Sequence, residues 1–272
     1  MNNNDYQEMP CISSHWLIAM LDSPRQCFDK YLDPMRPPQS KSDALRFGTL
    51  VHGLALTPNQ FDREFLVADY ERRSLTGKAH YLELNATGLT VIKPVELEKA
   101  HAIVATLKSD PEVRKLLRGG KKERTIIQPR ARGLLPLKAR LDIHHESKRQ
   151  VVELKTTYSL RAVETAMERY HYPLSAAFYR DMSQSLSVIF VFVQTAPPYE
   201  VAVIPMDQPQ LQTGREQWQA ALQRFDQCWK TNEWPDVKPT APELDDDPLM
   251  MNFLPAMPSR RRFEIPVGEL AL

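Results

Sequence analysis

Hydrophobic and polar residues alternate along residues 137–143, where leucine, alanine and isoleucine occupy every second position. This period of two is typical of a β-strand, and Asp142 occupies one of the polar positions. A second alternating stretch, residues 151–156, carries Glu153 and Lys155 two positions apart, so both side chains share one face of the strand. A short polar connection joins the two stretches. We therefore predict a hairpin that can bring Asp142, Glu153 and Lys155 together at one end.

Helical spacing dominates the chain before this hairpin. Apolar residues recur at intervals of three and four, with serine or proline at the expected helix starts. The predicted helices span residues 12–21, 23–31, 43–56 and 94–118, the last of them broken at Asp110-Pro111, and a further helix begins at Thr76. The other predicted segments are a loose arm at residues 1–11, a proline-rich loop at 34–42, and a short helix end with a strand at 61–68.

Strands and helices alternate in the second half of the chain. Strands are predicted over residues 121–129, the hairpin, 186–193 and 199–204, and helices over 160–170, 173–182 and 208–229. The continuous apolar run at 186–193 indicates a central strand buried on both faces. This order predicts an α/β fold, with a mixed central β-sheet flanked by helices and a helical N-terminal extension. We expect one domain over residues 1–272, composed of a mostly helical part (1–118), a core (119–232) and an extended tail (233–272).

The composition indicates a globular protein from a reducing compartment. Hydrophobic residues make up 42% of the 272 residues and charged residues 25%, values typical of soluble domains. No apolar run approaches the roughly 20 residues that cross a bilayer, and the polar N-terminus does not resemble a secretion signal. The three cysteines, Cys11, Cys27 and Cys228, lack the spacing of a metal clip or a disulfide framework. We expect a cytoplasmic protein with no membrane segment.

Charge is unevenly distributed, although the net charge is only +1. Nine lysines and arginines lie within residues 115–140, with Lys108 and Arg114 just before them, whereas Glu123 is the single acidic residue of that segment. This basic segment leads directly into the predicted hairpin, where it would attract a polyanion. An ordinary solvated surface is the alternative explanation.

Two carboxylates and an ammonium on a rigid backbone are the groups that a magnesium-dependent phosphodiester hydrolase needs. Mg²⁺ takes oxygen ligands and keeps several waters, so Asp142, Glu153 and the backbone carbonyl of Leu154 are suited to hold it. Bound metal would activate the attacking water and stabilise the leaving oxygen. Lys155 would position that water or help to deprotonate it, and would offset charge on the phosphorane.

The same pattern has simpler explanations. An aspartate followed, after ten residues, by Glu-x-Lys is common, and surface charge pairing or an ion pair within the sheet would account for it. Placement favours a metal site, since Glu153 and Lys155 lie in an otherwise apolar strand, where unpaired charges are costly to bury. His52, in a predicted helix, is on its own more typical of a structural histidine than of a ligand. Gly48 and Gly53 nearby indicate that another segment approaches this helix closely.

Taken together, several motifs resemble the PD-(D/E)XK nuclease superfamily. The resemblance is strongest to the phage and prophage recombination exonucleases of the exonuclease VIII (RecE) type, with lambda exonuclease a more distant relative. The matching residues extend over most of the chain. They are Ile12-Ser-Ser, Ser23-Pro24, Phe47-Gly-Thr-Leu-Val-His52 with Pro58 and Phe61, Thr76-Gly-Lys78, Leu141-Asp142, Glu153-Leu-Lys-Thr156, Ala177-Phe-Tyr179 and Trp234-Pro235.

The resemblance implies a role for each residue of the site. The metal ligands that it implies are His52, Asp142, Glu153 and the carbonyl of Leu154. The catalytic residues that it implies are Lys155, Asp142, Glu153 and Tyr179. Tyr179 matches the tyrosine of the family's Gln-x-x-x-Tyr motif, but Ser175 stands where the family has glutamine. Serine is shorter, so a polar contact there would need a bridging water.

The resemblance further implies an activity. Relatives degrade one strand of linear double-stranded DNA from 5′ to 3′, with Mg²⁺ as cofactor and Mn²⁺ as a substitute. The resemblance also implies a ring-shaped homo-oligomer for this protein, either a trimer or a tetramer. Such a ring would act with a single-strand annealing protein in phage-type recombination. Arg25 and Lys78 would contact phosphates, since each lies in a polar segment that matches the family, and Ser175 would face the DNA. Ordinary surface cations are the alternative for Arg25 and Lys78.

Two other functions are compatible with these motifs. One is an endonuclease of the same superfamily, although not of the CRISPR-adaptation type, which normally holds an iron–sulfur cluster on four cysteines. The other is a DNA-binding module without activity, which Ser175 would favour. His52, Asp142, Glu153 and Lys155 are all present, and they argue against an inactive module. We therefore expect a metal-dependent exonuclease.

Overall fold

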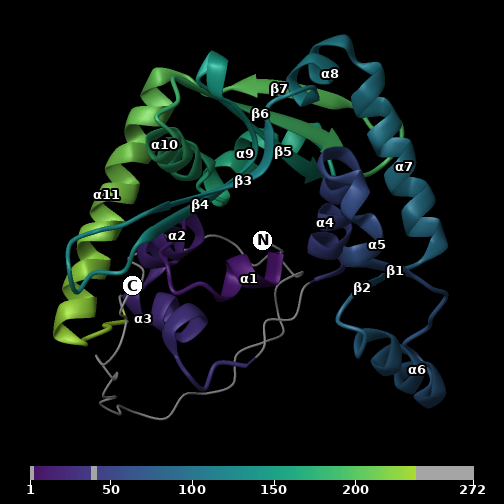
Figure 1. The fold of residues 1–272 in the computed structure, drawn as a ribbon, viewed down its shortest axis with the longest axis horizontal. Helices are drawn as coiled ribbons and strands as arrows, with labels where there is room; N and C mark the ends of the chain where they lie inside the picture. The colour runs from purple at the N-terminus through teal and green to yellow at the C-terminus, as the bar shows by residue number, and fades with distance from the viewer. Residues whose placement is uncertain (1–2, 38–41, 237–272) are drawn as a thin grey trace.

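The computed structural model describes residues 3–37 and 42–236 (Figure 1). Five strands form one sheet in the order β3-β4-β5-β6-β7. Their bounds are β3 Lys121–Gln128, β4 Leu137–His145, β5 Gln150–Thr157, β6 Ser187–Gln194 and β7 Val201–Pro205. β5 and β6 run parallel, whereas the other neighbouring strands are antiparallel. The predicted mixed α/β fold is confirmed.

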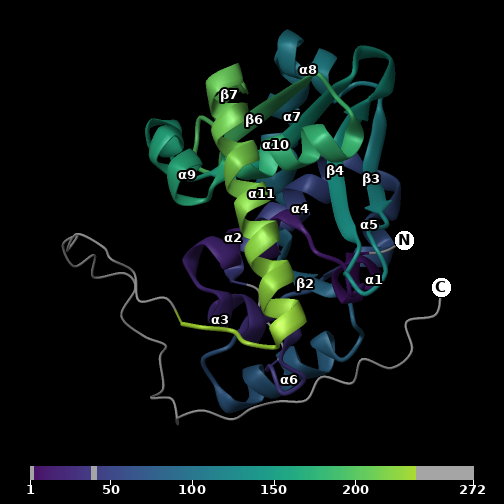
Figure 2. The ribbon, with the colours of Figure 1, turned by 90° about the vertical axis from the view of Figure 1, so that its left-hand side faces the viewer.

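Helices cover both faces of this sheet (Figures 1 and 2). The α-helices are α1 Asn3–Glu8, α2 Ser14–Asp22, α3 Pro24–Cys27, α4 Asp43–Leu56, α5 Phe61–Glu64, α6 Leu75–Asn85, α7 Pro94–Ser109, α8 Pro111–Leu117, α9 Val163–Arg169, α10 Tyr172–Ser183 and α11 Gln208–Thr231. Shorter helical turns are η1 Phe28–Leu32, η2 Pro58–Gln60, η3 Glu146–Lys148 and η4 Leu160–Ala162. None of these described helices is both long enough and apolar enough to span a membrane.

The sheet separates two apolar cores. On one face α2, α10 and α11 bury Leu17, Phe178 and Phe225 against it. On the other face α4, α7 and α8 form a second core around Leu50 and Ile103. β6 contributes alternate residues to both cores, as its continuous apolar run predicts. The architecture is therefore three layers, with the sheet in the middle.

Most predicted elements are present to within two residues at each end. The break at Asp110-Pro111 is confirmed, because the Asp110 carboxylate accepts a hydrogen bond from the Val113 amide and caps α8. The sequence does not predict β2 (Thr90–Ile92), which is too short to show alternation and pairs in parallel with β1 (Phe65–Val67). α6 follows β1, has no buried residue, and lies away from the main sheet in both views (Figures 1 and 2).

The N-terminal arm is not loose over residues 3–11, contrary to the prediction for residues 1–11, whose first two residues lie outside the described part of the chain. It contains α1, from which Tyr6 is buried. The Lys138 ammonium donates hydrogen bonds to the backbone carbonyls of Tyr6 (2.5 Å) and Met9 (2.9 Å), and lies over the Tyr6 ring. Lys138 is only 2% exposed, and a buried ammonium requires such acceptors. The polar face of β4 is therefore covered at this end by the arm.

The chain after α11 returns toward α3. Trp234 packs against Phe28 and Phe225, and the Pro235 carbonyl accepts a hydrogen bond from the Arg25 amide. These are the first residues of the tail predicted for 233–272. From residue 237 onward that tail lies outside the described residues.

β4 and β5 pair over only three residues before they separate. The antiparallel pairing joins residues 143–145 to 150–152 and stops short of Asp142. Farther along the same edge of β4, Leu137 forms a parallel bridge with Ile12, which directly follows the N-terminal arm. A gap between the two strands therefore opens beside Asp142.

Gly214 marks a close approach of α10 and α11. A Cβ at this position would overlap the carbonyl oxygen of Pro173. We predict that Gly214→Ala lowers the free energy of unfolding by about 1–3 kcal/mol, because the two helices must separate. Thr213→Ala, at the exposed neighbouring position, should change it by less than about 0.5 kcal/mol. Urea denaturation followed by circular dichroism measures both values, and a Gly214→Ala variant as stable as the wild type would contradict this packing.

Candidate active site

Asp142 is the centre of a charged cluster in the gap between β4 and β5. Its carboxylate accepts a hydrogen bond from the Leu154 amide across the gap, at 2.7 Å. The Glu153 carboxylate accepts one from the Asp142 amide in the opposite direction, at 3.2 Å. Buried amides require partners, and here two carboxylates provide them where the backbone pairing ends. The positions of both acids are therefore fixed by the backbone of the opposite strand.

The backbone of Leu154 faces the same gap. In a strand, the N–H and C=O of one residue point toward the same neighbouring strand. Because the Leu154 amide donates to Asp142, its carbonyl is also directed toward the gap. This orientation agrees with the expected role of the Leu154 carbonyl as a metal ligand.

Lys155 adds a positive charge from β5. Its Nζ lies 3.0 Å from Glu153 Oε2 and 3.9 Å from Asp142 Oδ2. Burial would lower the pKa of Lys155, but the two carboxylates outweigh this effect and raise it. Lys155 is therefore a stable ammonium that can offset negative charge beside the carboxylates.

His52 reaches the cluster from α4. Its Nδ1 lies 3.6 Å from Asp142 Oδ1. α4 can lie close to β5 because Gly48, one turn earlier, has no side chain: a Cβ there would be 3.1 Å from the Thr156 hydroxyl. The close approach predicted at Gly48 is thus confirmed. Burial would lower the pKa of His52, but Asp142 outweighs it and raises this pKa, so a metal and a proton would compete for the ring nitrogen.

Glu123 belongs to the cluster, although the sequence analysis does not identify it as a site residue. It lies on β3 opposite Asp142. The regular pairing of β3 with β4 includes the residues on either side of these two but skips this one pair. One ligand atom from each of His52, Glu123 and Asp142 lies within 4.8 Å of the other two. Two carboxylate oxygens and an imidazole nitrogen form a donor set that suits a divalent cation. The only signal in the sequence is that Glu123 is the single acid in the basic segment.

The backbone at Glu123 is also unusual. Its φ of +48° lies in the left-handed region, which side chains other than glycine rarely adopt. Such a conformation costs on the order of 1–3 kcal/mol and is concentrated at functional sites. The strained backbone therefore supports a functional role for this residue.

The three acids have different affinities for protons. Burial would raise the pKa of Asp142, but His52 and Lys155 outweigh it and lower this pKa to about 2. Burial and the Asp142 charge raise the pKa of Glu123 to about 7, and they raise the pKa of Glu153 to about 7 as well. Asp142 is therefore ionised at neutral pH, whereas the other two carboxyl groups are only partly ionised there, and a cation would displace their remaining protons.

α10 supplies Tyr179 to the edge of the cluster. The Tyr179 hydroxyl is 3.2 Å from the Ser14 hydroxyl at the start of α2. Burial raises the pKa of Tyr179, and the charges of Glu153 and Lys155 act on the same hydroxyl. Ser175 lies one turn earlier on the same helix, at a half-buried position.

The other two predicted DNA contacts lie on different elements. Lys78 is exposed on α6, far from the sheet in both views (Figures 1 and 2). Arg25 lies on α3, where its Nε is 2.8 Å from an Asp29 carboxylate oxygen. The structure thus brings together His52, Asp142, Glu153, Leu154, Lys155 and Tyr179, and it places Lys78 elsewhere.

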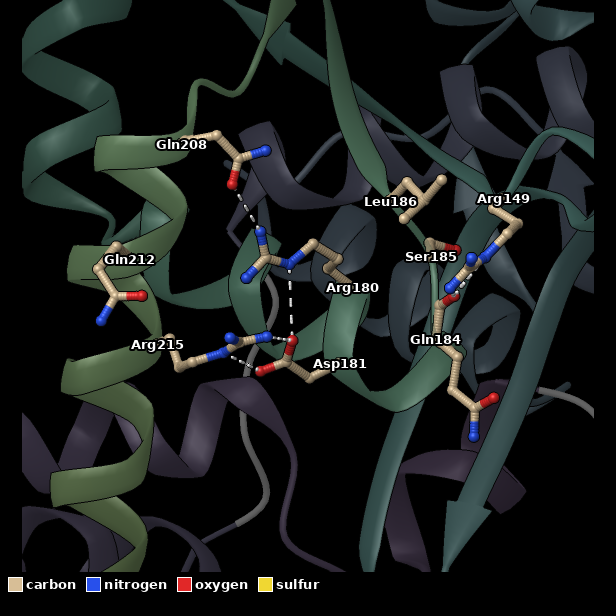
Figure 3. Close-up of a pocket in the computed structure, with 9 residues that line it drawn as sticks. All are labelled: Arg149, Arg180, Asp181, Gln184, Ser185, Leu186, Gln208, Gln212 and Arg215. Carbon is tan, nitrogen blue, oxygen red and sulfur yellow. Dashed lines mark hydrogen bonds and ion pairs between the residues drawn. The ribbon is translucent and has the colours of Figure 1, made fainter.

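A surface hollow of about 560 Å³ is separate from this cluster (Figure 3). Its polar walls include Arg149, Arg180 and Arg215, and none of the cluster residues lines it. Arg215 donates to the Asp181 carboxylate, and Arg149 donates to the Gln184 carbonyl at 3.0 Å. Because the acids, histidine and lysine converge in the gap between β4 and β5, we place the candidate active site there.

Comparison with known proteins identifies a family for the chain. A family model described as a PDDEXK-like domain of unknown function (DUF3799) matches residues 13–239. The chain belongs to this PDDEXK-like family. Asp142 and Glu153-Leu-Lys155 match the acidic and lysine positions in the family's name, with Leu141 where the name has proline.

One solved structure supports the same fold. A putative exonuclease from Eubacterium rectale superposes with a TM-score of 0.63 at 16% identity, over 90% of this chain and 91% of that one. A phage-related exonuclease from Haemophilus somnus is more remote, with a TM-score of 0.36 and 12% identity over 82% and 96% of the two chains. The comparison with curated proteins gave no match. The PDDEXK-like family and the acid–histidine cluster support a nuclease that uses a divalent metal.

Metal affinity should increase with pH. Asp142 has a pKa of about 2 and is ionised both below and above neutral pH. Glu123 and Glu153 have pKa values of about 7 and become protonated as the pH falls below neutrality. Since a cation must displace both of these protons, Mn²⁺ binding should weaken by up to about a hundredfold for each pH unit well below neutrality. Titration calorimetry in two buffers of different ionisation enthalpy measures the affinity and the protons released. An affinity that does not vary with pH would contradict the assignment.

Glu123→Gln tests the contribution of the acid on β3. It should weaken Mn²⁺ binding at basic pH by roughly ten- to a hundredfold and flatten the pH dependence, because one ligand and one titrating group are lost. Glu146→Gln is a matched control, since Glu146 is an exposed carboxylate paired with Lys121 outside the cluster. The same titrations should show wild-type affinity for this control. A Glu123→Gln variant with unchanged binding would exclude Glu123 as a ligand.

Proposed function

We propose that this protein is a Mg²⁺-dependent exonuclease that degrades one strand of linear double-stranded DNA from 5′ to 3′, with Mn²⁺ as a substitute. The observation that carries the proposal is the cluster of His52, Glu123 and Asp142 beside Glu153 and Lys155. It combines the hard ligands that Mg²⁺ prefers with an ammonium that can offset charge on a phosphate. Membership of the PDDEXK-like family supports the same chemistry.

Each residue of the cluster has a proposed role. Asp142, His52 and Glu123 would hold the cation, and Glu153 with the Leu154 carbonyl would complete or extend its coordination. A bound metal supplies a more acidic water and stabilisation of the leaving oxygen. Lys155, held 3.0 Å from Glu153, would orient the water and neutralise charge on the phosphorane. Tyr179 would position the phosphate through its hydroxyl.

Part of the basic segment supports DNA binding, and part of it is structural. Lys138 is buried beneath α1, and Arg130 forms a hydrogen-bonded ion pair with Asp226 at 3.0 Å. Lys115 and Arg118, by contrast, are exposed where α8 leads into β3. Because β3, which follows α8, also carries Glu123, we propose that these cations lie on the approach to the cluster. They would attract the phosphate backbone without reading its sequence.

The proposed biological setting rests on the resemblance to recombination exonucleases. We propose a ring-shaped homo-oligomer, trimer or tetramer, that acts in the cytoplasm with a single-strand annealing protein. Arg25, Lys78 and Ser175 remain proposed DNA contacts. Sedimentation velocity tests the assembly, and a protein that stays monomeric at micromolar concentration would contradict the ring.

Substrate topology distinguishes this proposal from the alternatives. With Mg²⁺, the protein should release nucleotides from a 5′-labelled linear duplex and leave a closed circle intact. EDTA should stop the reaction, and added Mg²⁺ or Mn²⁺ should restore it. Cutting of the circle would indicate an endonuclease of the same family. DNA binding with no metal-dependent cleavage would indicate an inactive module, which the complete cluster argues against.

Asp142→Asn tests the central ligand while retaining an acceptor for the Leu154 amide. Loss of the carboxylate charge should raise the activation barrier by about 3 kcal/mol or more, which is roughly a hundredfold in rate. Nucleotide release from linear duplex measures the effect, and circular dichroism checks the fold. Glu146→Gln, which removes a carboxylate charge outside the cluster, should keep wild-type activity. An Asp142→Asn enzyme with normal activity would refute the proposed site.

A further inference from the structure

A series of aromatic rings leads from the molecular surface to Lys155. The outermost ring is Tyr170, which is 53% exposed and contacts Tyr172 with ring centroids 5.9 Å apart. Tyr172 in turn stacks on Phe190 at 5.3 Å, with an interplanar angle of 21°. The Lys155 ammonium lies 5.9 Å from the centre of the Phe190 ring. Continuous contacts therefore connect an exposed tyrosine with the charged cluster.

Tyr172 is the link between the surface and the cluster. It is half-buried at the start of α10, two turns before Tyr179 on the same helix. Burial raises the pKa of Tyr172, and the charges of Lys155 and Tyr170 also act on its hydroxyl. The helix face that carries Tyr179 thus continues toward the surface through Tyr172.

Tyr170 has the surroundings of a binding surface. The guanidinium of Arg169, its exposed neighbour, lies 5.9 Å from the centre of the Tyr170 ring. His171, between the two tyrosines, has a φ of +50°, which is a strained conformation for a residue other than glycine. The junction between α9 and α10 therefore presents an exposed aromatic ring with a cation over it.

The chemistry of this surface fits a nucleobase with its phosphate. Every base has a π face that stacks on an exposed tyrosine, whatever its sequence, and arginine pairs with the neighbouring phosphate. Bases inside a duplex already stack on one another, so only an unpaired base can use the ring. We infer that Tyr170, supported by Tyr172 and flanked by Arg169, binds an unpaired base of the DNA strand whose phosphate lies at Lys155. This inference rests on the proposed nuclease function and specifies the DNA structure that the site holds.

A fluorescent base tests the inference directly. 2-Aminopurine is placed either in a short single-stranded 5′ overhang or in a blunt duplex end, with Ca²⁺ replacing Mg²⁺ to prevent cleavage. The wild-type protein should quench the overhang probe, because stacking on Tyr170 quenches its emission, and should leave the paired probe nearly unchanged. Tyr170→Leu should lose this quenching and bind the overhang substrate about five- to tenfold more weakly, with blunt-end binding unchanged.

Two matched variants separate stacking from other effects. Tyr170→Phe keeps the ring and should retain both quenching and affinity. Tyr81→Leu removes another tyrosine, on α6, which lies well away from α9 in both ribbon views (Figures 1 and 2), and should resemble the wild type. Loss of quenching in Tyr170→Phe or in Tyr81→Leu would overturn the stacking role. Circular dichroism of each variant excludes misfolding as the cause.

The outcomes also distinguish this inference from the proposed function. If the wild type cleaves linear DNA with Mg²⁺ but Tyr170→Leu quenches and binds like the wild type, the base-binding site is refuted and the nuclease stands. If the wild type neither binds nor cleaves DNA, both proposals are refuted. Quenching of the blunt-end probe as strong as that of the overhang would refute the preference for an unpaired base.

Discussion

The hydrogen bond from the Leu154 amide to the Asp142 carboxylate is the interaction on which the candidate site depends. Two strands that separate inside a protein leave buried amides, and each amide must find an acceptor. Here the acceptors are the acids that also form the charged cluster. The same carboxylate that satisfies the backbone also attracts His52 and Lys155. The stability of the sheet and the chemistry of the site are therefore coupled at Asp142.

The gap between β4 and β5 also explains why helices from both layers can contribute. A fully paired sheet would keep a histidine on α4 apart from a tyrosine on α10, because the strands would lie between them. Where the pairing ends, His52 and Tyr179 both approach the same acids. The helices are held near the sheet by close contacts at Gly48 and Gly214, where a side chain would not fit without displacement. Packing at these two glycines, which take no part in the chemistry, thus helps to determine the geometry of the cluster.

Local patterns explain which parts could be predicted from the sequence. The hairpin and the shared face of Glu153 and Lys155 follow from alternation over a few residues, and the structure has both. Only the resemblance to the PD-(D/E)XK superfamily indicates that His52 belongs to the site, since no local pattern connects this residue with the hairpin. Glu123 could not be recognised, because its position depends on a pairing with β4 and on a backbone angle that the sequence does not mark. The burial of Lys138 could not be predicted for a similar reason: its acceptors belong to an arm far away in the sequence.

The carboxylates that replace backbone acceptors also make the site visible to hydrogen exchange. The amide protons of Asp142 and Leu154 are held by side chains, so their exchange rates depend on the ionisation and metal occupancy of the acids. Ile143 and Val152, each next to one of the site acids, are paired with each other in the regular ladder. Their exchange instead reports the opening of the sheet as a whole. Neighbouring amides on one pair of strands would thus record the state of the site and the stability of the fold in a single measurement.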